Sequence, residues 1–110
     1  MTVRRYSVVW TEVAARDVER LAAYLWNETP HRAQEIIDRI VARADSLESS
    51  PLRGRTPPEL KSLGDQNWRE VLLPPWRILY RISGRHVEIH GVLDGRRSLQ
   101  DILLQRLLES

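Results

Sequence analysis

The chain has 110 residues, of which 42% are hydrophobic and 29% charged. This balance is typical of a globular protein and excludes a disordered segment. At this length folding buries roughly 65% of the unfolded surface, so we expect a single domain over residues 1–110. The chain has no cysteine, which excludes disulfides, thiolate catalysis and Cys-based zinc sites and fits the cytoplasm. No apolar run approaches the ~20 residues of a membrane span, and the first residues lack a signal peptide's core, so we expect no membrane contact.

The charge of the chain is concentrated in one region and carried almost entirely by arginine. Seventeen basic residues stand against 15 acidic ones, and Lys61 is the only lysine. Residues 50–97 hold nine basic and five acidic side chains, a net charge of +4, whereas each flank is at −1. Guanidinium groups stay protonated and grip phosphate or carboxylate in a planar fork. The expected partner is therefore a nucleic acid or an acidic protein surface.

The first half of the chain predicts a strand followed by two helices. Residues 6–10 are β-branched and aromatic, and Thr11 can cap a helix over residues 12–28. Thr29 and Pro30 supply an N-cap and a first-turn proline for a second helix, which ends before Ser49-Ser50-Pro51. The apolar stripe of the first helix comprises Ala14, Val18, Leu21, Ala22 and Leu25, and that of the second Ala33, Ile37, Ile40, Val41, Ala44 and Leu47. Together they predict an αα-hairpin.

Residues 51–67 predict an irregular loop, because Gly54, Pro57, Pro58 and Gly64 punctuate it. The loop also carries three basic side chains, namely Arg53, Arg55 and Lys61. Long loops in small domains are often functional, so this one is a candidate binding surface.

Three strand-like runs follow, at residues 68–73, 76–82 and 86–93. Gly84 begins a two-residue hairpin loop that sets Ser83 opposite His86. Counting back from this turn pairs Ile82 with Val87, Tyr80 with Ile89, Ile78 with Gly91 and Trp76 with Leu93 on one face, and Arg81 with Glu88, Leu79 with His90 and Arg77 with Val92 on the other. Arg77, Arg81, Glu88 and His90 should therefore share a face.

A final helix is predicted after Ser98, where Asp101 completes a capping-box-like start. Its leucines extend around more than one stripe, which indicates a partner that covers them. The complete prediction is an α+β fold with an N-terminal strand, an αα-hairpin, a three-stranded antiparallel meander and a C-terminal helix.

The residue motifs exclude metal sites and phosphate loops, and they leave RNA cleavage as an open possibility. The chain's histidines, His31, His86 and His90, have no i,i+4 partner, so no metal site is expected, and no Gly-rich phosphate loop or other cofactor motif is present. RNA cleavage needs only cations, a base and an acid. Arg77 and Arg81 can supply the charge and His90, tuned by Glu88, the proton. The alternative is that Arg81 and Glu88 form an ordinary cross-strand ion pair and His90 is a packing residue.

Several short strings make the chain similar to the RelE/ParE toxin superfamily, from the first helix to the end of the chain. The strings that carry the resemblance are Trp68-Arg69-Glu70, Trp76-Arg77-Ile78-Leu79-Tyr80-Arg81-Ile82, Val87-Glu88-Ile89 and Asp94-Gly95-Arg96-Arg97. The resemblance implies the toxin of a type II toxin–antitoxin pair, cytoplasmic, and neutralised in a hetero-oligomer by a cognate antitoxin. On that basis the antitoxin would contact the terminal helix through Leu99, Leu103, Leu104 and Leu107.

The superfamily divides by target, and the resemblance is closer to ParE-like members, which poison DNA gyrase. RelE-like members cut messenger RNA on the ribosome with basic residues that Arg69, Arg77 and Arg97 match here. Their terminal-helix Tyr falls on or near Leu103, and no Tyr lies beyond Tyr80, so a ribonuclease would need His90 instead. A gyrase inhibitor would use the target-binding residues Arg53, Arg55, Arg81, Arg96 and Arg97. A third hypothesis is a non-toxic member that only binds antitoxin.

Overall fold

The computed structural model describes residues 6–61, 64 and 67–95. The predicted terminal helix lies outside the described residues, and with it lie Arg96, Arg97, Leu99, Leu103, Leu104 and Leu107. The helices are α1 (Glu12–Glu28), α2 (Pro30–Asp45), a 3₁₀ turn η1 (Ser46–Glu48) and α3 (Pro58–Lys61). The strands are β1 (Ser7–Trp10), β2 (Trp68–Leu73), β3 (Trp76–Ser83) and β4 (His86–Asp94). The α+β class is confirmed. The short helix α3, inside the segment predicted to be irregular, was not predicted.

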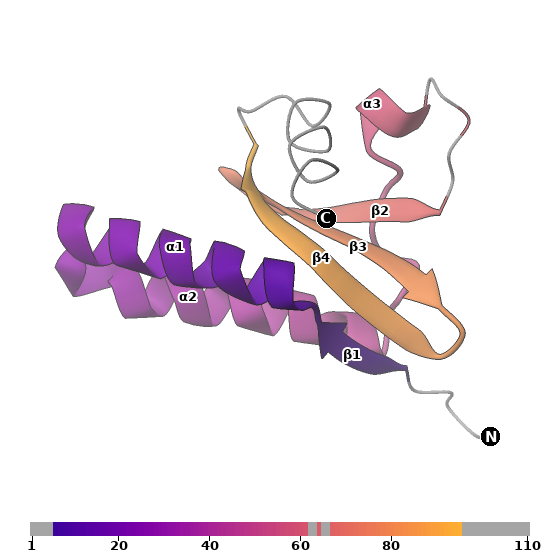
Figure 1. Cartoon of the computed structure of the whole chain (residues 1–110), viewed down its shortest axis with the longest axis horizontal. Coiled ribbons are helices and arrows are strands. Elements are labelled where there is room, and N and C mark those ends of the chain that lie inside the picture. The colour runs from indigo at the N-terminus through magenta and orange to yellow at the C-terminus, as the bar shows by residue number, and fades with distance from the viewer. Residues whose placement is uncertain (1–5, 62–63, 65–66, 96–110) are drawn as a thin grey trace.

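The strands form one four-stranded sheet in the order β1-β4-β3-β2. β2, β3 and β4 pair antiparallel with their neighbours in the chain, and β1 pairs parallel with β4. Figure 1 shows α1 and α2 together along one side of the sheet, with α3 at the other side near β2. No helix in the described part of the chain is long and apolar enough to cross a membrane.

The N-terminus of α1 is tied to the sheet by Thr11. The Thr11 hydroxyl accepts a hydrogen bond from the Ala14 nitrogen (3.2 Å) and donates to the Ile89 carbonyl (2.8 Å). The predicted cap is therefore confirmed, and it also positions α1 against β4. Pro30 occupies the first turn of α2 as predicted, but the Thr29 side chain makes no capping hydrogen bond.

The main core lies between the helix pair and the sheet. Tyr80, Ile78, Val87 and Ile89 of the sheet and Ile40 of α2 are fully buried there. In α2 the structure buries Ile36, which the predicted stripe omitted, and leaves Ile37 and Val41 partly exposed. Because α2 contacts both α1 and β2, its buried face is wider than one helical stripe.

The β3–β4 register is confirmed from the turn as far as Tyr80 opposite Ile89 and is wrong beyond that point. A bulge at His90 shifts every later pair by one residue. Leu79 therefore pairs with Gly91, Ile78 with Val92, Arg77 with Leu93 and Trp76 with Asp94. The shift turns Val92 toward the main core and Leu93 toward the opposite face.

Candidate functional site: the open face of the sheet

The sheet face turned away from α1 and α2, which we call the open face, carries a small second core. Leu60 of α3 packs there with Leu79 and Leu93, and Trp68 lies partly buried against them. Leu60 thereby anchors α3 over the sheet. Charged side chains lie around this apolar cluster, so the candidate residues of the open face are supported by packed hydrophobic side chains.

The first group of charged residues on the open face is centred on Glu88. Its Oε1 accepts a hydrogen bond from Arg81 Nε at 3.0 Å and lies 3.1 Å from His90 Nε2. Trp68 completes the group, because its ring forms a T-shaped contact with His90, with 4.9 Å between the ring centroids, and its centroid lies 5.5 Å from Arg81 Cζ. The hydrogen bond with His90, followed by that with Arg81, lowers the pKa of Glu88 below its ordinary value. The predicted shared face is thus correct here, and Arg81 and Glu88 do form a cross-strand ion pair.

The second group is a buried charge network around Arg77. Arg77 Nε donates to Glu70 Oε1 at 2.6 Å, and its two terminal nitrogens bind both oxygens of Glu59 at 2.8 and 2.9 Å. The other Glu70 oxygen accepts from Arg55 Nε at 2.9 Å. Hydrogen bonds with Glu59 raise the pKa of Arg77 above its ordinary value, against the effect of burial. All three nitrogens of the Arg77 guanidinium are therefore engaged by carboxylates.

Arg69 lies on the opposite face of the sheet from Arg77. In the β2–β3 register Arg69 pairs with Tyr80, whereas Arg77 pairs with Leu72, and successive residues of a strand alternate between faces. Arg69 Nη1 donates to the Gly54 carbonyl at 2.7 Å and contacts the Leu52 carbonyl at 3.4 Å. The structure therefore does not bring Arg69 and Arg77 together, and Arg97 lies outside the described residues.

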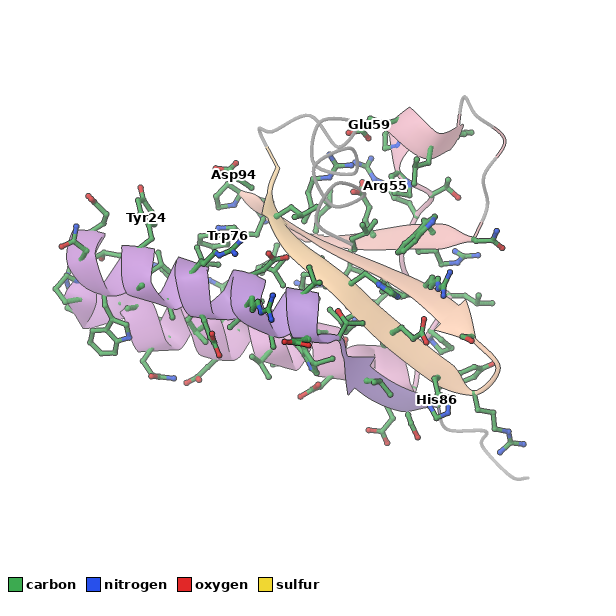
Figure 2. All side chains as sticks on the ribbon, viewed as in Figure 1. Tyr24, Arg55, Glu59, Trp76, His86 and Asp94 are labelled. Carbon is green, nitrogen blue, oxygen red and sulfur yellow. The ribbon has the colours of Figure 1, made fainter. Side chains whose placement is uncertain are left out.

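The basic loop after η1 contributes Arg55 to the open face and Arg53 to the helix side. Arg55 forms a single antiparallel bridge with Glu70, through backbone hydrogen bonds of 3.0 and 2.8 Å, and so extends the edge of β2. Figure 2 shows Arg55 and Glu59 near α3. Arg53 instead donates from Nη1 to the Ser46 hydroxyl at 3.1 Å. These two neighbouring arginines therefore serve different surfaces.

A cavity of about 510 Å³ adjoins the Arg77 network. Arg55, Glu59 and Arg77 form its polar wall, and the Pro74–Pro75 turn with Trp76 forms an apolar one. No motif in the sequence marks Glu70 and Glu59 as the partners of Arg77, because a glutamate that forms a buried ion pair looks like any other glutamate in the sequence. The one available signal was that Glu70 and Arg77 alternate onto the same face, but this needed the β2 register. Among the described residues, no group of His, Asp and Glu side chains has an arrangement that would hold a metal ion.

A helical pair packed on a four-stranded mixed sheet, with paired arginines and glutamates on the open face, agrees with the RelE/ParE class of small toxins. The chain belongs to the ParE toxin family of the type II toxin–antitoxin system parDE, whose pattern it matches over residues 8–99.

Its relatives and structural neighbours agree with that membership. It is 34% identical to the putative toxin Y4kP of Sinorhizobium fredii over 90% of this chain and 98% of that one. It is 35% identical to toxin RelE2 of Caulobacter vibrioides over 74% and 86% of the two chains. A chain of the chromosomal ParDE system of P. aeruginosa has the same fold, with a TM-score of 0.69 and 20% identity over 83% of this chain and 97% of that one. The toxin–antitoxin complex RelBE2 of Mycobacterium tuberculosis aligns with a TM-score of 0.58 and 27% identity, over 82% of this chain and 98% of that one. The chain is therefore a toxin of a type II toxin–antitoxin system, and its expected partner is an antitoxin.

Proposed function

We propose that this toxin arrests growth by inhibiting DNA gyrase in the cytoplasm, through protein contacts rather than catalysis, and that its cognate antitoxin neutralises it in a hetero-oligomer. The observation that carries the proposal is the state of Arg77. A ribonuclease of this class needs Arg77 as a cation for the developing phosphorane charge. Here that guanidinium is engaged by Glu59 and Glu70 on all three nitrogens.

The positions of the other residues that a ribonuclease could use also support gyrase inhibition. Arg69 faces the other side of the sheet and binds loop carbonyls. Tyr80 is fully buried in the main core, so it cannot replace the proton donor that the terminal helix lacks. His90 and Arg81 remain on the open face, but both are paired with Glu88. One titratable side chain without a free cation beside it is a poor catalyst for phosphodiester cleavage.

The proposed target contacts are two arginines of the open face and its edge, together with the Arg96-Arg97 pair of the sequence. Arg55 and Arg81 are 57% and 45% exposed, and Arg96 and Arg97 follow Gly95 at the end of β4. Guanidinium groups that are partly neutralised on one side and open on the other suit an acidic protein surface. The proposal assigns these four residues to the gyrase contact.

The experiment that tests the proposal is a supercoiling assay with purified gyrase and the antitoxin-free toxin. We expect loss of supercoiling that the antitoxin reverses. Arg81→Glu should weaken inhibition about tenfold or more, whereas Arg20→Glu, an exposed arginine of α1, should leave it unchanged. Undiminished supercoiling at toxin concentrations that arrest growth would overturn the proposal.

The alternative function is ribosome-dependent cleavage of messenger RNA, and the 3.1 Å contact between His90 and Glu88 favours it. A carboxylate beside a histidine is the arrangement that positions an imidazole for proton transfer. Primer extension in a purified translation system tests it: ribosome-dependent stops that disappear in His90→Ala would establish this function. If His90→Ala stays toxic and the message stays intact, cleavage is excluded. If overexpression without antitoxin is harmless, the chain is a non-toxic antitoxin-binding member.

A further inference from the structure

A second basic surface lies on the helix side, away from the open face. Arg39 and Arg43 of α2 and Arg53 of the following loop surround a pocket of about 300 Å³. Ala42, Ser46 and Leu73 form the rest of its lining. Because Leu73 alternates onto the helix side of β2 and packs in the main core, the pocket has an apolar floor beneath its cations. We call this pocket, with Arg39, Arg43 and Arg53 in its lining, the arginine pocket.

The positive charge of the arginine pocket is not balanced by carboxylates. Within the part of the chain that the structure describes, no ion pair involves Arg39, Arg43 or Arg53. Among the described residues, the side chain that Arg53 contacts is Ser46, through its neutral hydroxyl. By contrast, Arg55, Arg77 and Arg81 all pair with glutamates. Three like charges around one small pocket repel each other, and an anionic group placed among them relieves that repulsion.

The backbone that carries these arginines is held in place by contacts within the toxin itself. Arg39 and Arg43 are four residues apart on α2, so they lie on one face of the helix. The loop that carries Arg53 is fixed by Tyr80, whose hydroxyl donates to the Pro51 carbonyl at 2.7 Å, and by Arg69, which donates to the Gly54 carbonyl. A rigid loop lowers the entropy lost when a partner binds.

An exposed apolar residue adjoins Arg53 in the sequence. Leu52 precedes Arg53 in the loop and is 66% exposed, the most exposed of the large hydrophobic residues described. Leu52 belongs to neither of the two hydrophobic clusters of the described residues. Arginine and buried apolar contacts are the residues that concentrate binding energy at protein interfaces. The pocket therefore suits a ligand that is both acidic and apolar.

We infer that the arginine pocket is a docking site for an acidic, amphipathic segment of the antitoxin, with carboxylates among the three arginines and an apolar side chain against Leu52 and Leu73. The inference rests on the antitoxin partnership in the proposed function. A nucleic acid is disfavoured because a phosphate backbone is followed by an extended track of cations, whereas these three arginines line one small, open pocket together with the apolar Leu73. The site lies on the opposite side of the sheet from Arg81, so antitoxin binding here is separable from target contact.

The test is isothermal titration calorimetry of the toxin with its cognate antitoxin. The variants are Arg39→Glu, Arg53→Glu and Leu52→Ser, and the matched control is Arg20→Glu on α1. We expect each arginine variant to weaken binding about tenfold or more and to reduce its dependence on salt, and Leu52→Ser to weaken it without changing the salt dependence. Charge reversal of an antitoxin carboxylate to arginine should restore binding to Arg39→Glu. Circular dichroism confirms that each variant is folded.

The outcomes separate this inference from the proposed function. Unchanged antitoxin affinity in all three variants overturns the inference, even where wild-type toxin binds and inhibits gyrase. Loss of affinity equal to that of Arg20→Glu also overturns it, because the effect is then one of net charge. Variants that keep antitoxin affinity but lose binding to a fluorescent RNA or DNA duplex would reassign the pocket to nucleic acid. Absence of any binding by wild-type toxin would refute the antitoxin partnership itself.

Discussion

The hydroxyl of Tyr80 lies 2.8 Å from the backbone nitrogen of Gly54, from which it accepts a hydrogen bond. The same hydroxyl donates to the Pro51 carbonyl at 2.7 Å. One buried phenol thus satisfies a donor and an acceptor of a loop whose described residues form a single isolated bridge to the sheet. Arg69, paired with Tyr80 in the sheet register, satisfies the Gly54 carbonyl. Because buried backbone groups need partners, these two side chains determine where the basic loop runs.

Replacing Tyr80 with Phe should destabilise the protein by about 1–3 kcal/mol, because the Gly54 nitrogen and the Pro51 carbonyl then lose a buried partner. Urea unfolding measures the loss, and Tyr24→Phe, at an exposed tyrosine of α1, is the matched control. Burial raises the pKa of Tyr80 above 10.0. The contribution of this group is therefore complete below pH 10 and is lost as pH rises through the raised pKa. A Tyr80→Phe variant as stable as Tyr24→Phe would contradict this role.

Gly54 should not tolerate even alanine. A Cβ at this position would lie 2.6 Å from the Tyr80 hydroxyl oxygen and 2.7 Å from the Glu70 carbonyl oxygen. One of these neighbours is backbone and cannot move aside, so Gly54→Ala should cost about 1–3 kcal/mol of unfolding free energy. In the Tyr80→Phe background the cost should fall but not vanish, because the Glu70 contact remains. Strictly additive costs in this double-mutant cycle would show that the two residues do not meet.

The bulge at His90 illustrates what the sequence predicts and what it does not. The Gly84 turn fixes the β3–β4 register for its first four pairs, because turn geometry acts locally. Beyond Tyr80 the register depends on α1, where Asp17 Oδ2 accepts a hydrogen bond from the Val92 nitrogen at 3.0 Å. That contact joins residues 75 positions apart, so no local pattern reports it. The bounds of α1, the start of α2 and the positions of the strands, in contrast, followed from periodicity and capping residues.

The candidate site was likewise predictable near the Gly84 turn and not predictable where it depends on contacts between distant parts of the chain. The shared face of Arg81, Glu88 and His90 was predictable, because these residues lie close to the turn. The network around Arg77 was not predictable. The pairing of β2 with β3 places Glu70 beside Arg77, and α3, a short helix that depends on tertiary packing, places Glu59 there. The predicted role of Arg77 as a free cation depended on partners that the sequence could not locate.

Removing one partner of the buried Glu70–Arg77 ion pair should lower the free energy of unfolding far more than replacing both partners with apolar residues. Glu70 is 1% exposed, so Glu70→Ala leaves Arg77 partly unpaired in a buried site, and we expect a loss of about 3–5 kcal/mol. The double variant Glu70→Leu with Arg77→Met removes both charges and should be more stable than Glu70→Ala alone, since Glu59 and Arg55 are exposed enough to be hydrated. Chemical denaturation of the three proteins measures the comparison. A double variant less stable than Glu70→Ala would mean that the network stabilises the fold outright.

The contribution of Glu88 to stability should depend on pH in the acidic range. His90 and then Arg81 hold the pKa of Glu88 below its ordinary value of 4.5. A carboxylate whose folded pKa is depressed stabilises the fold above the unfolded pKa and loses that contribution as pH falls through the folded pKa. Wild-type toxin should therefore exceed Glu88→Gln in thermal stability at pH 6, and the difference should shrink steadily below pH 4.5. Glu35→Gln, at an exposed carboxylate of α2, controls for the loss of one negative charge. A difference between wild type and Glu88→Gln that stays constant down to pH 3 would show that His90 and Arg81 do not stabilise the Glu88 carboxylate in solution.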